Sequence, residues 1–182
     1  MFNQGWYRKA KHIVSKNFNQ RPNNIEISLV VIHCISLPEG EYLNSNVESL
    51  FINKLDCNLH QSFVDLESVE VSAHFYIKRT GEIIQFVSVD DRAWHAGVSS
   101  FQGRKGCNDF SIGIELQGTD KTAYESEQYK SLNKLLTDLK DTYVEINAVT
   151  GHQNIAPRRK TDPGEYFDWD KVNNLQGIDK YH

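Results

Sequence analysis

The sequence predicts a single-domain α/β protein with a mixed central β-sheet flanked by helices. Short β-branched runs at residues 28–35 and 111–116 are typical of buried strands, and an apolar stripe at helical spacing follows Thr122. A chain of 182 residues is long enough to build its own core without disulfide bonds. Residues 1–182 are therefore expected to form one domain.

Composition excludes several classes of protein. A net charge of −4 argues against a general nucleic-acid binder. No run approaches the roughly 20 apolar residues of a membrane span, and the first residues lack the pattern of a signal peptide. Cys34, Cys57 and Cys107 are odd in number and widely spaced, which favours reduced thiols over a disulfide framework. We therefore expect a cytoplasmic protein without membrane, nucleic-acid or obligatory protein partners.

The first strand of the predicted core brings a histidine to its end. Residues 1–26 form a polar, turn-rich lead-in without clear periodicity. Residues 28–35 then form an apolar run that Pro38 and Gly40 stop, as expected of a strand covered on both faces. His33 lies at the end of this run, where open α/β sheets place their ligands.

A short helix and a hairpin are expected next. Residues 46–54 have apolar side chains at helical spacing, whereas residues 56–70 are polar and loop-like. Apolar and polar residues alternate over residues 71–78, and a turn leads to a second strand at residues 82–87. This arrangement predicts a β-hairpin.

A long loop at residues 90–108 precedes the next predicted strand. Loops of this length inside a domain are often binding elements. On the strand that follows, Ser111, Gly113 and Glu115 share one face. A carboxylate beside two small residues implies a pocket over that face, although a bare surface would also fit.

The C-terminal third predicts a core helix followed by a strand. Thr122 and Glu125 have the capping-box spacing, which predicts a helix start. The apolar stripe of this helix consists of Tyr129, Leu132, Leu135, Leu136 and Leu139. A strand at residues 146–150 is expected to deliver His152. Asp168 is expected to cap a last helix, and the C-terminal tail is expected to fray.

The short stretch after the last predicted strand collects a histidine, a lysine and an aspartate. Two prolines and a glycine there predict an irregular loop, not a helical face. The imidazole of His152 and the carboxylate of Asp162 are zinc-ligand types, and a catalytic zinc site needs a third protein ligand. His33, His74 and His95 compete for that position, and His33 is favoured because it ends the most buried strand. An ordinary surface loop is the alternative for the pair taken alone.

Five segments together closely resemble the AmpD family, the cytoplasmic 1,6-anhydro-N-acetylmuramyl-L-alanine amidases of Gram-negative bacteria. The segments are residues 31–38, 71–75, 92–97, 107–115 and 150–164. This family belongs to the zinc amidases related to phage T7 lysozyme and to the peptidoglycan recognition proteins. The resemblance covers nearly the whole chain, in order, and implies a T7 lysozyme-like zinc amidase fold.

The resemblance also implies a reaction and assigns roles to five residues. His33, His152 and Asp162 match the family's ligands for Zn²⁺. Glu115 matches the general base and Lys160 the cation that stabilises the developing oxyanion, and zinc-assisted hydrolysis needs such parts. The implied substrate is an anhydromuramyl peptide, cleaved between the lactyl group of 1,6-anhydro-N-acetylmuramic acid and L-alanine. The implied roles are peptidoglycan recycling and control of β-lactamase induction.

Three further residues are expected to bind the substrate. Trp94 and Arg104 are expected to line the groove, because an aromatic ring can pack on a sugar and a cation can pair with peptide carboxylates. A core aromatic is the alternative for Trp94. Cys34 stands where relatives commonly have asparagine, and Gly106 where some carry a basic residue, so substrate contacts are expected to differ there.

Three other functions compete with this interpretation. A non-catalytic muropeptide-binding module is disfavoured because the ligand types, the base and the lysine are all present. A wall-lytic amidase acting outside the cell is disfavoured because neither a signal peptide nor a wall-binding domain supports it. A cysteine hydrolase using Cys107 lacks the spacing of a catalytic triad.

Overall fold

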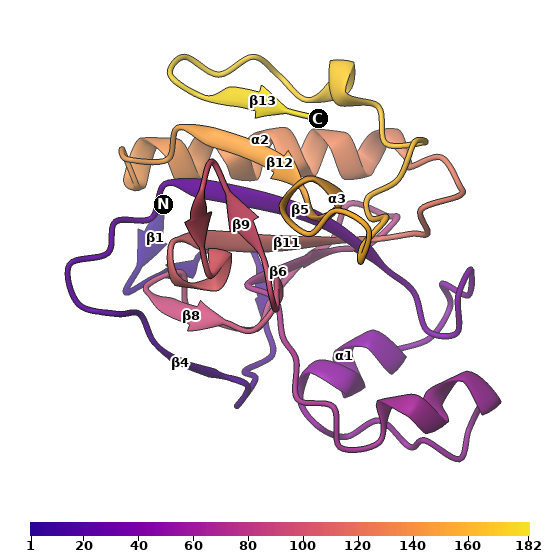
Figure 1. The fold of residues 1–182 in the computed structure, drawn as a ribbon. Coiled ribbons are helices and arrows are strands. Elements are labelled where there is room, and N and C mark those ends of the chain that lie inside the picture. The colour runs from indigo at the N-terminus through magenta and orange to yellow at the C-terminus, as the bar shows by residue number, and fades with distance from the viewer.

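A seven-stranded sheet forms the centre of the computed structural model, which describes residues 1–182 (Figure 1). The strand order is β13-β12-β5-β11-β6-β7-β3. These strands are β3 (Lys11–His12), β5 (Leu29–Ile35), β6 (Phe75–Ile77), β7 (Ile83–Gln85), β11 (Ser111–Gln117), β12 (Ala148–Gly151) and β13 (Asp179–Tyr181). All neighbours are parallel except the β6–β7 hairpin. The predicted α/β class with a mixed central sheet flanked by helices is confirmed.

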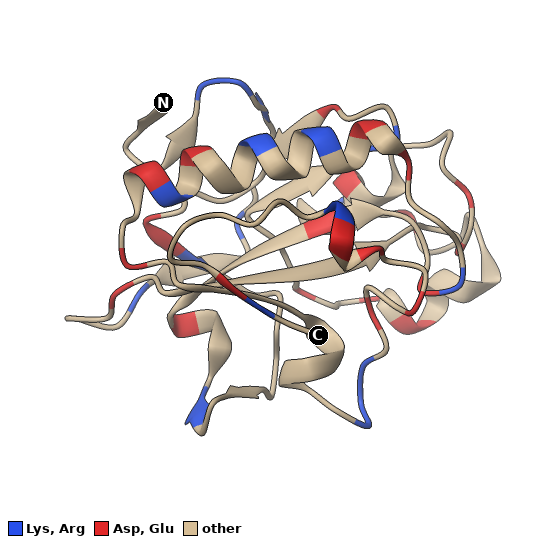
Figure 2. Ribbon diagram, turned by 90° about the horizontal axis from the view of Figure 1, so that it is seen from above, with Lys and Arg blue, Asp and Glu red and all other residues tan.

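Helix α2 (Ser126–Thr142) covers one face of the sheet (Figure 1). Its predicted apolar stripe is buried in the main core cluster, where it packs with Ile32 of β5 and Ile114 of β11. Each leucine removed from water in this way contributes about 1.5–3 kcal/mol to stability. The outer side of α2 carries acidic and basic residues in mixture (Figure 2), as expected for a helix with one solvated face.

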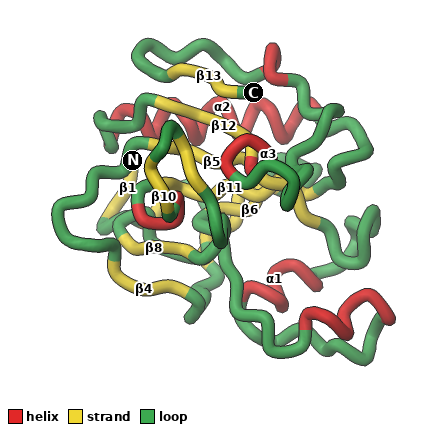
Figure 3. The backbone as a smooth tube through the Cα atoms, viewed as in Figure 1, coloured by secondary structure: helices red, strands yellow, loops and turns green.

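The opposite face is covered by shorter elements and long loops (Figure 3). Helix α1 (Asn46–Phe51), which the sequence predicted, packs Leu50 and Phe51 against Ile84 and Phe86. The segment from Trp94 to Phe110 covers another part of this face. Strand β8 (Asp91–Ala93) comes directly before this segment. The segment itself contains β9 (Ser100–Phe101), β10 (Arg104–Lys105) and the 3₁₀ turn η2 (Cys107–Asp109).

Several predicted boundaries were wrong. The N-terminal lead-in is not irregular, because it forms β1 (Phe2–Asn3), β2 (Trp6–Tyr7), β3 and β4 (Phe18–Gln20). These strands have two or three residues each, which is too short to produce a period in the sequence. Strand β6 is also shorter than predicted, and residues 56–70 contain the 3₁₀ helix η1 (Gln61–Leu66).

The ends of the C-terminal elements also differ from the prediction. The capping box of α2 is formed by Glu125 and Gln128, so the predicted start at Thr122 was three residues early. Asp168 does cap a turn by accepting from the Asp170 amide, but that turn is only η3 (Trp169–Lys171). The tail is not frayed, because β13 adds to the sheet beside β12. None of the helices has the length and apolar character needed to cross a membrane.

Candidate metal centre and active site

Two neighbouring parallel strands bring the first two candidate ligands together. His33 lies near the carboxyl end of β5, and His152 follows the carboxyl end of β12. His152 begins a single helical turn, α3 (His152–Ile155), so the prediction of a wholly irregular loop was wrong at this residue. Asp162 is held close to His152 because the backbone N–H of Gln153 donates a 2.8 Å hydrogen bond to the backbone carbonyl of Asp162.

The three predicted ligands converge. The Nδ1 atoms of His33 and His152 are 2.9 Å apart, and Asp162 Oδ2 lies 3.1 Å from the first and 3.0 Å from the second. This is a group of three whose ligand atoms lie within 4.8 Å of one another and could hold a metal ion. Cys34 is not part of the group, because its strand alternates and its side chain packs against the α2-side core.

The charge states of this group suit a divalent cation. Burial lowers the pKa of His33 to about 4, which keeps its imidazole neutral at neutral pH. Burial raises the pKa of the Asp162 carboxyl, but the adjacent His152 and His33 rings outweigh burial and hold this pKa below its usual value. His152 Nε2 faces the Ala96 carbonyl at 3.2 Å, so Nε2 donates a hydrogen, and Nδ1 is the ring nitrogen that faces His33 and Asp162. Two imidazoles and a carboxylate are ligand types that zinc binds.

Glu115 lies beside this group on the neighbouring strand. It is the register partner of His33 across the β5–β11 pair, and its side chain points to the same face. Glu115 is 9 % exposed, and its Oε2 has no hydrogen-bond partner. Burial, reinforced by the nearby Asp162 carboxylate, raises the pKa of Glu115 well above its usual value. A carboxyl that is buried and unpaired beside a metal group is suited to proton transfer.

Lys160 and Asp162 line one cavity of about 390 Å³. Cys34 lines the same cavity, and burial raises the pKa of its thiol to about 12, so the thiol is neutral. Lys160 is exposed, which leaves its ammonium free to approach a bound molecule. The structure therefore gathers a cation, a carboxylate and a thiol at the opening of the candidate site.

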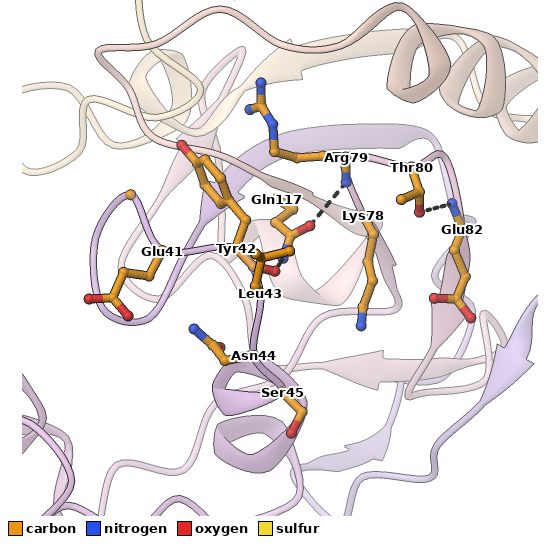
Figure 4. A pocket seen from close by; sticks show the side chains of 11 residues that line it. Glu41, Tyr42, Leu43, Asn44, Ser45, Lys78, Arg79, Thr80, Glu82 and Gln117 are labelled. Atoms are coloured by element: carbon orange, nitrogen blue, oxygen red, sulfur yellow. Dashed lines mark hydrogen bonds between the residues drawn. The ribbon is translucent and has the colours of Figure 1, made fainter.

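A second, larger cavity of about 1070 Å³ was not predicted from the sequence (Figure 4). Gln117 lies two residues beyond Glu115 on the same face of β11 and lines it. The Gln117 amide group accepts from the Arg79 backbone at 3.0 Å and donates to the Tyr42 carbonyl at 2.9 Å (Figure 4). Lys78 at its wall pairs with Glu48 at 2.6 Å. None of the predicted site residues lines this cavity.

The structure does not bring Trp94 and Arg104 to the cavity that holds Lys160. The Trp94 indole N–H donates to Asn19 Oδ1 at 3.0 Å. The Arg104 guanidinium lies over the Phe110 ring, 3.8 Å from its centroid. Neither residue lines either of the two cavities described above.

The sequence left His95 as a residue that supports the site or packs near it, and it gave no sign of the contact that His95 makes with His33. His33 Nε2 lies 2.9 Å from His95 Nδ1, a contact between residues 62 positions apart. The predicted pocket over Gly113 is filled, because a Cβ on this glycine would come within 2.4 Å of the His95 ring. The two small residues beside Glu115 were the available signal, since they make room for this imidazole. Burial lowers the pKa of His95 well below its usual value, so the ring is neutral.

Comparison with known proteins agrees with this geometry. A family model described as N-acetylmuramoyl-L-alanine amidase matches residues 20–165. Over 176 residues the chain is 48% identical to the 1,6-anhydro-N-acetylmuramyl-L-alanine amidase AmpD of Citrobacter freundii, with 96% of this chain and 94% of that protein covered. A crystal structure of a selenomethionine AmpD derivative superposes with a TM-score of 0.92 at 48% identity, covering 94% of this chain and 97% of that one.

A more distant structure is that of the N-acetylmuramyl-L-alanine amidase AmiD from Escherichia coli. It was solved in complex with the substrate anhydro-N-acetylmuramic acid-L-Ala-D-γ-Glu-L-Lys. The TM-score is 0.58 at 26% identity, with 87% of this chain and 65% of that chain covered. The chain described here thus belongs to the N-acetylmuramoyl-L-alanine amidase family and, within it, to the AmpD amidases.

Proposed function

We propose that the protein hydrolyses, with zinc, the amide bond between the lactyl group of 1,6-anhydro-N-acetylmuramic acid and L-alanine. The observation that carries this proposal is the convergence of His33, His152 and Asp162 beside the buried, unpaired carboxyl of Glu115. The substrate class is supported by the name of the Citrobacter freundii relative and by the anhydromuramyl peptide bound to AmiD.

Three side chains form the site that would hold zinc. His33 and His152 each present Nδ1, and Asp162 presents Oδ2, to a common point. Zinc, when bound there, supplies polarisation of the scissile carbonyl and activation of a water for attack. The neutral state of His33 keeps its ring available as a ligand at neutral pH.

The remaining steps belong to side chains of this chain. Glu115 accepts a proton from the attacking water and returns it to the amine nitrogen of the leaving L-alanine. Its raised pKa suits the first step, because a more basic carboxylate takes a proton from water more readily. Lys160, which is exposed at the rim of the adjoining cavity, stabilises the negative charge that develops on the carbonyl oxygen.

The proposal also covers the residues that bind the substrate and the cellular location of the enzyme. Cys34 forms part of the cavity wall, where its neutral thiol gives a less polar contact than an amide would. Trp94 and Arg104 stay predicted substrate contacts, and they would have to act outside the cavity of Lys160. We place the enzyme in the cytoplasm as one domain of residues 1–182, acting in peptidoglycan recycling and in control of β-lactamase induction.

A mass-spectrometric assay on anhydromuramyl-tripeptide tests this function. The purified protein is assayed as prepared, after chelation, and after zinc is added back. We expect free tripeptide in the first sample, none after chelation, and recovery with zinc. If the substrate binds but stays intact in all three samples, the protein is a muropeptide-binding module and the catalytic roles of Glu115 and Lys160 are wrong.

A further inference from the structure

A buried chain of hydrogen bonds starts at Ser111 and ends at His33. The Ser111 hydroxyl lies 2.5 Å from the Cys107 carbonyl, which can only accept. Its single hydrogen therefore points to Cys107. The second neighbour of Ser111 Oγ is His95 Nε2 at 3.2 Å, so this nitrogen must be the donor and carry a hydrogen.

The tautomer of His95 then determines the tautomer of His33. A neutral imidazole has one ring hydrogen, and that of His95 is on Nε2. His95 Nδ1 therefore has a free lone pair, and it accepts from His33 Nε2, 2.9 Å away. His33 in turn has its hydrogen on Nε2, so its Nδ1 lone pair points toward His152 Nδ1 and Asp162 Oδ2.

The residue after His95 acts on the other histidine. The Ala96 carbonyl accepts the Nε2 hydrogen of His152 at 3.2 Å. Asn108 Oδ1 accepts from the backbone amides of both His95 and Ala96, at 3.2 and 2.8 Å. One buried amide side chain therefore fixes the two consecutive residues that orient both imidazoles.

The sheet is shaped to receive the His95 ring. A Cβ on Gly113 would lie 2.4 Å from His95 Cγ and 2.7 Å from Nδ1 and Cδ2, so only glycine leaves room for the ring. Ser111 sits one step before Gly113 on the same face, where its hydroxyl reaches Nε2. Glu115 is the next residue of this face after Gly113.

From this network we propose that His95 is a positioning residue for the metal centre. It selects the His33 tautomer whose Nδ1 is free to bind metal, through the relay from His33 to His95, Ser111 and Cys107 O. The proposal rests on the proposed zinc site. Outer hydrogen bonds of this kind typically change metal affinity by about 10- to 100-fold when removed.

Nitrogen-15 NMR of the unmodified protein tests the relay before any residue is changed. In zinc-free protein we expect a hydrogen on Nε2 of both His33 and His95, and a ¹⁵N–¹⁵N coupling across the hydrogen bond from His33 Nε2 to His95 Nδ1. A hydrogen on His95 Nδ1, or on both of its nitrogens, overturns the proposal. This readout does not depend on zinc, so it stays decisive if the protein binds none and the proposed function fails.

Zinc affinity of matched variants tests the consequence. His95→Asn places an amide oxygen near the position of Nδ1 and should keep the dissociation constant within about threefold, whereas His95→Leu should weaken it about 10- to 100-fold. His12→Leu is the control, because His12 lies on β3 at the far edge of the sheet and contacts Tyr7 O. Equal losses in the two His95 variants, or no loss in His95→Leu, overturn the proposal, and thermal unfolding without zinc reports whether each variant is folded.

Discussion

The two faces of the central sheet are formed by the same strands but carry different side chains. Toward α2, strands β5 and β11 present Ile32, Ile114 and Leu116, which pack in the main core. Toward the other side they present His33 and Glu115, which are also buried. Because side chains alternate along a strand, adjacent residues serve stability on one face and chemistry on the other.

This contrast separates the effects of substitution. A change among the core residues of the α2 face should lower stability and leave zinc affinity intact, since Ile32, Ile114 and Leu116 do not belong to the ligand group. A change on the opposite face should lower zinc affinity or activity, because its polar groups are buried for their chemistry and not for packing. The predictions below test this separation, beginning with the largest effect.

Asp162→Ala should abolish zinc binding and, with it, detectable hydrolysis. The substitution removes the one carboxylate among three ligands, and two imidazoles alone do not make a closed zinc site. Metal analysis after dialysis measures the zinc content. Full occupancy in this variant would remove Asp162 from the ligand set.

Glu115→Gln should lower kcat about 10²- to 10⁴-fold and leave the zinc content unchanged. The amide preserves the size of the side chain but cannot take up a proton from water. Steady-state kinetics and metal analysis on the same sample give both values. Activity close to that of the parent protein would show that another group is the base.

Leu135→Ala should lower the free energy of unfolding by about 2–5 kcal/mol, as expected for a cavity in a packed core. Leu135 is a residue of α2 and is fully buried where this helix packs on the sheet. Its zinc dissociation constant should stay unchanged at a temperature where the variant is folded. A large loss of zinc affinity would contradict the separation of the two faces. Chemical denaturation and zinc titration supply the two measurements.

Gly113→Ala should weaken zinc binding about tenfold, through the His95 ring that the new methyl group displaces. Gly118→Ala is a useful comparison, because its methyl group would meet the Tyr124 ring and not the His95 ring. Both variants should lose some stability, but only Gly113→Ala should lose zinc affinity. Equal zinc affinities would show that His95 tolerates displacement.

The sequence was informative wherever a local pattern decides the structure. The stripe from Tyr129 to Leu139 predicted the buried side of α2, and the apolar run before His33 predicted β5. The ligand types His152 and Asp162 also stood out, since both lie in one short stretch. Three histidines competed to be the third ligand, and His33 was favoured because it ends the most buried strand; the resemblance then agreed with this choice.

The parts that could not be predicted depend on contacts between distant residues. His33 and His95 meet across 62 positions, and no local pattern records such a contact. Strands β3 and β13 pair only with strands that are distant in the sequence, β7 and β12. The cavity beside Gln117 arises where the 40–45 loop meets the β6–β7 turn, so it too requires the folded chain.

The most direct test of the zinc site is anomalous diffraction at the zinc edge from crystals of zinc-loaded protein. We expect a single peak bound by His33 Nδ1, His152 Nδ1 and an Asp162 carboxylate oxygen, at about 2.0–2.2 Å from each. Glu115 should lie beside the peak without binding it. A peak at other residues, or no peak in protein that cleaves the substrate, would contradict the account.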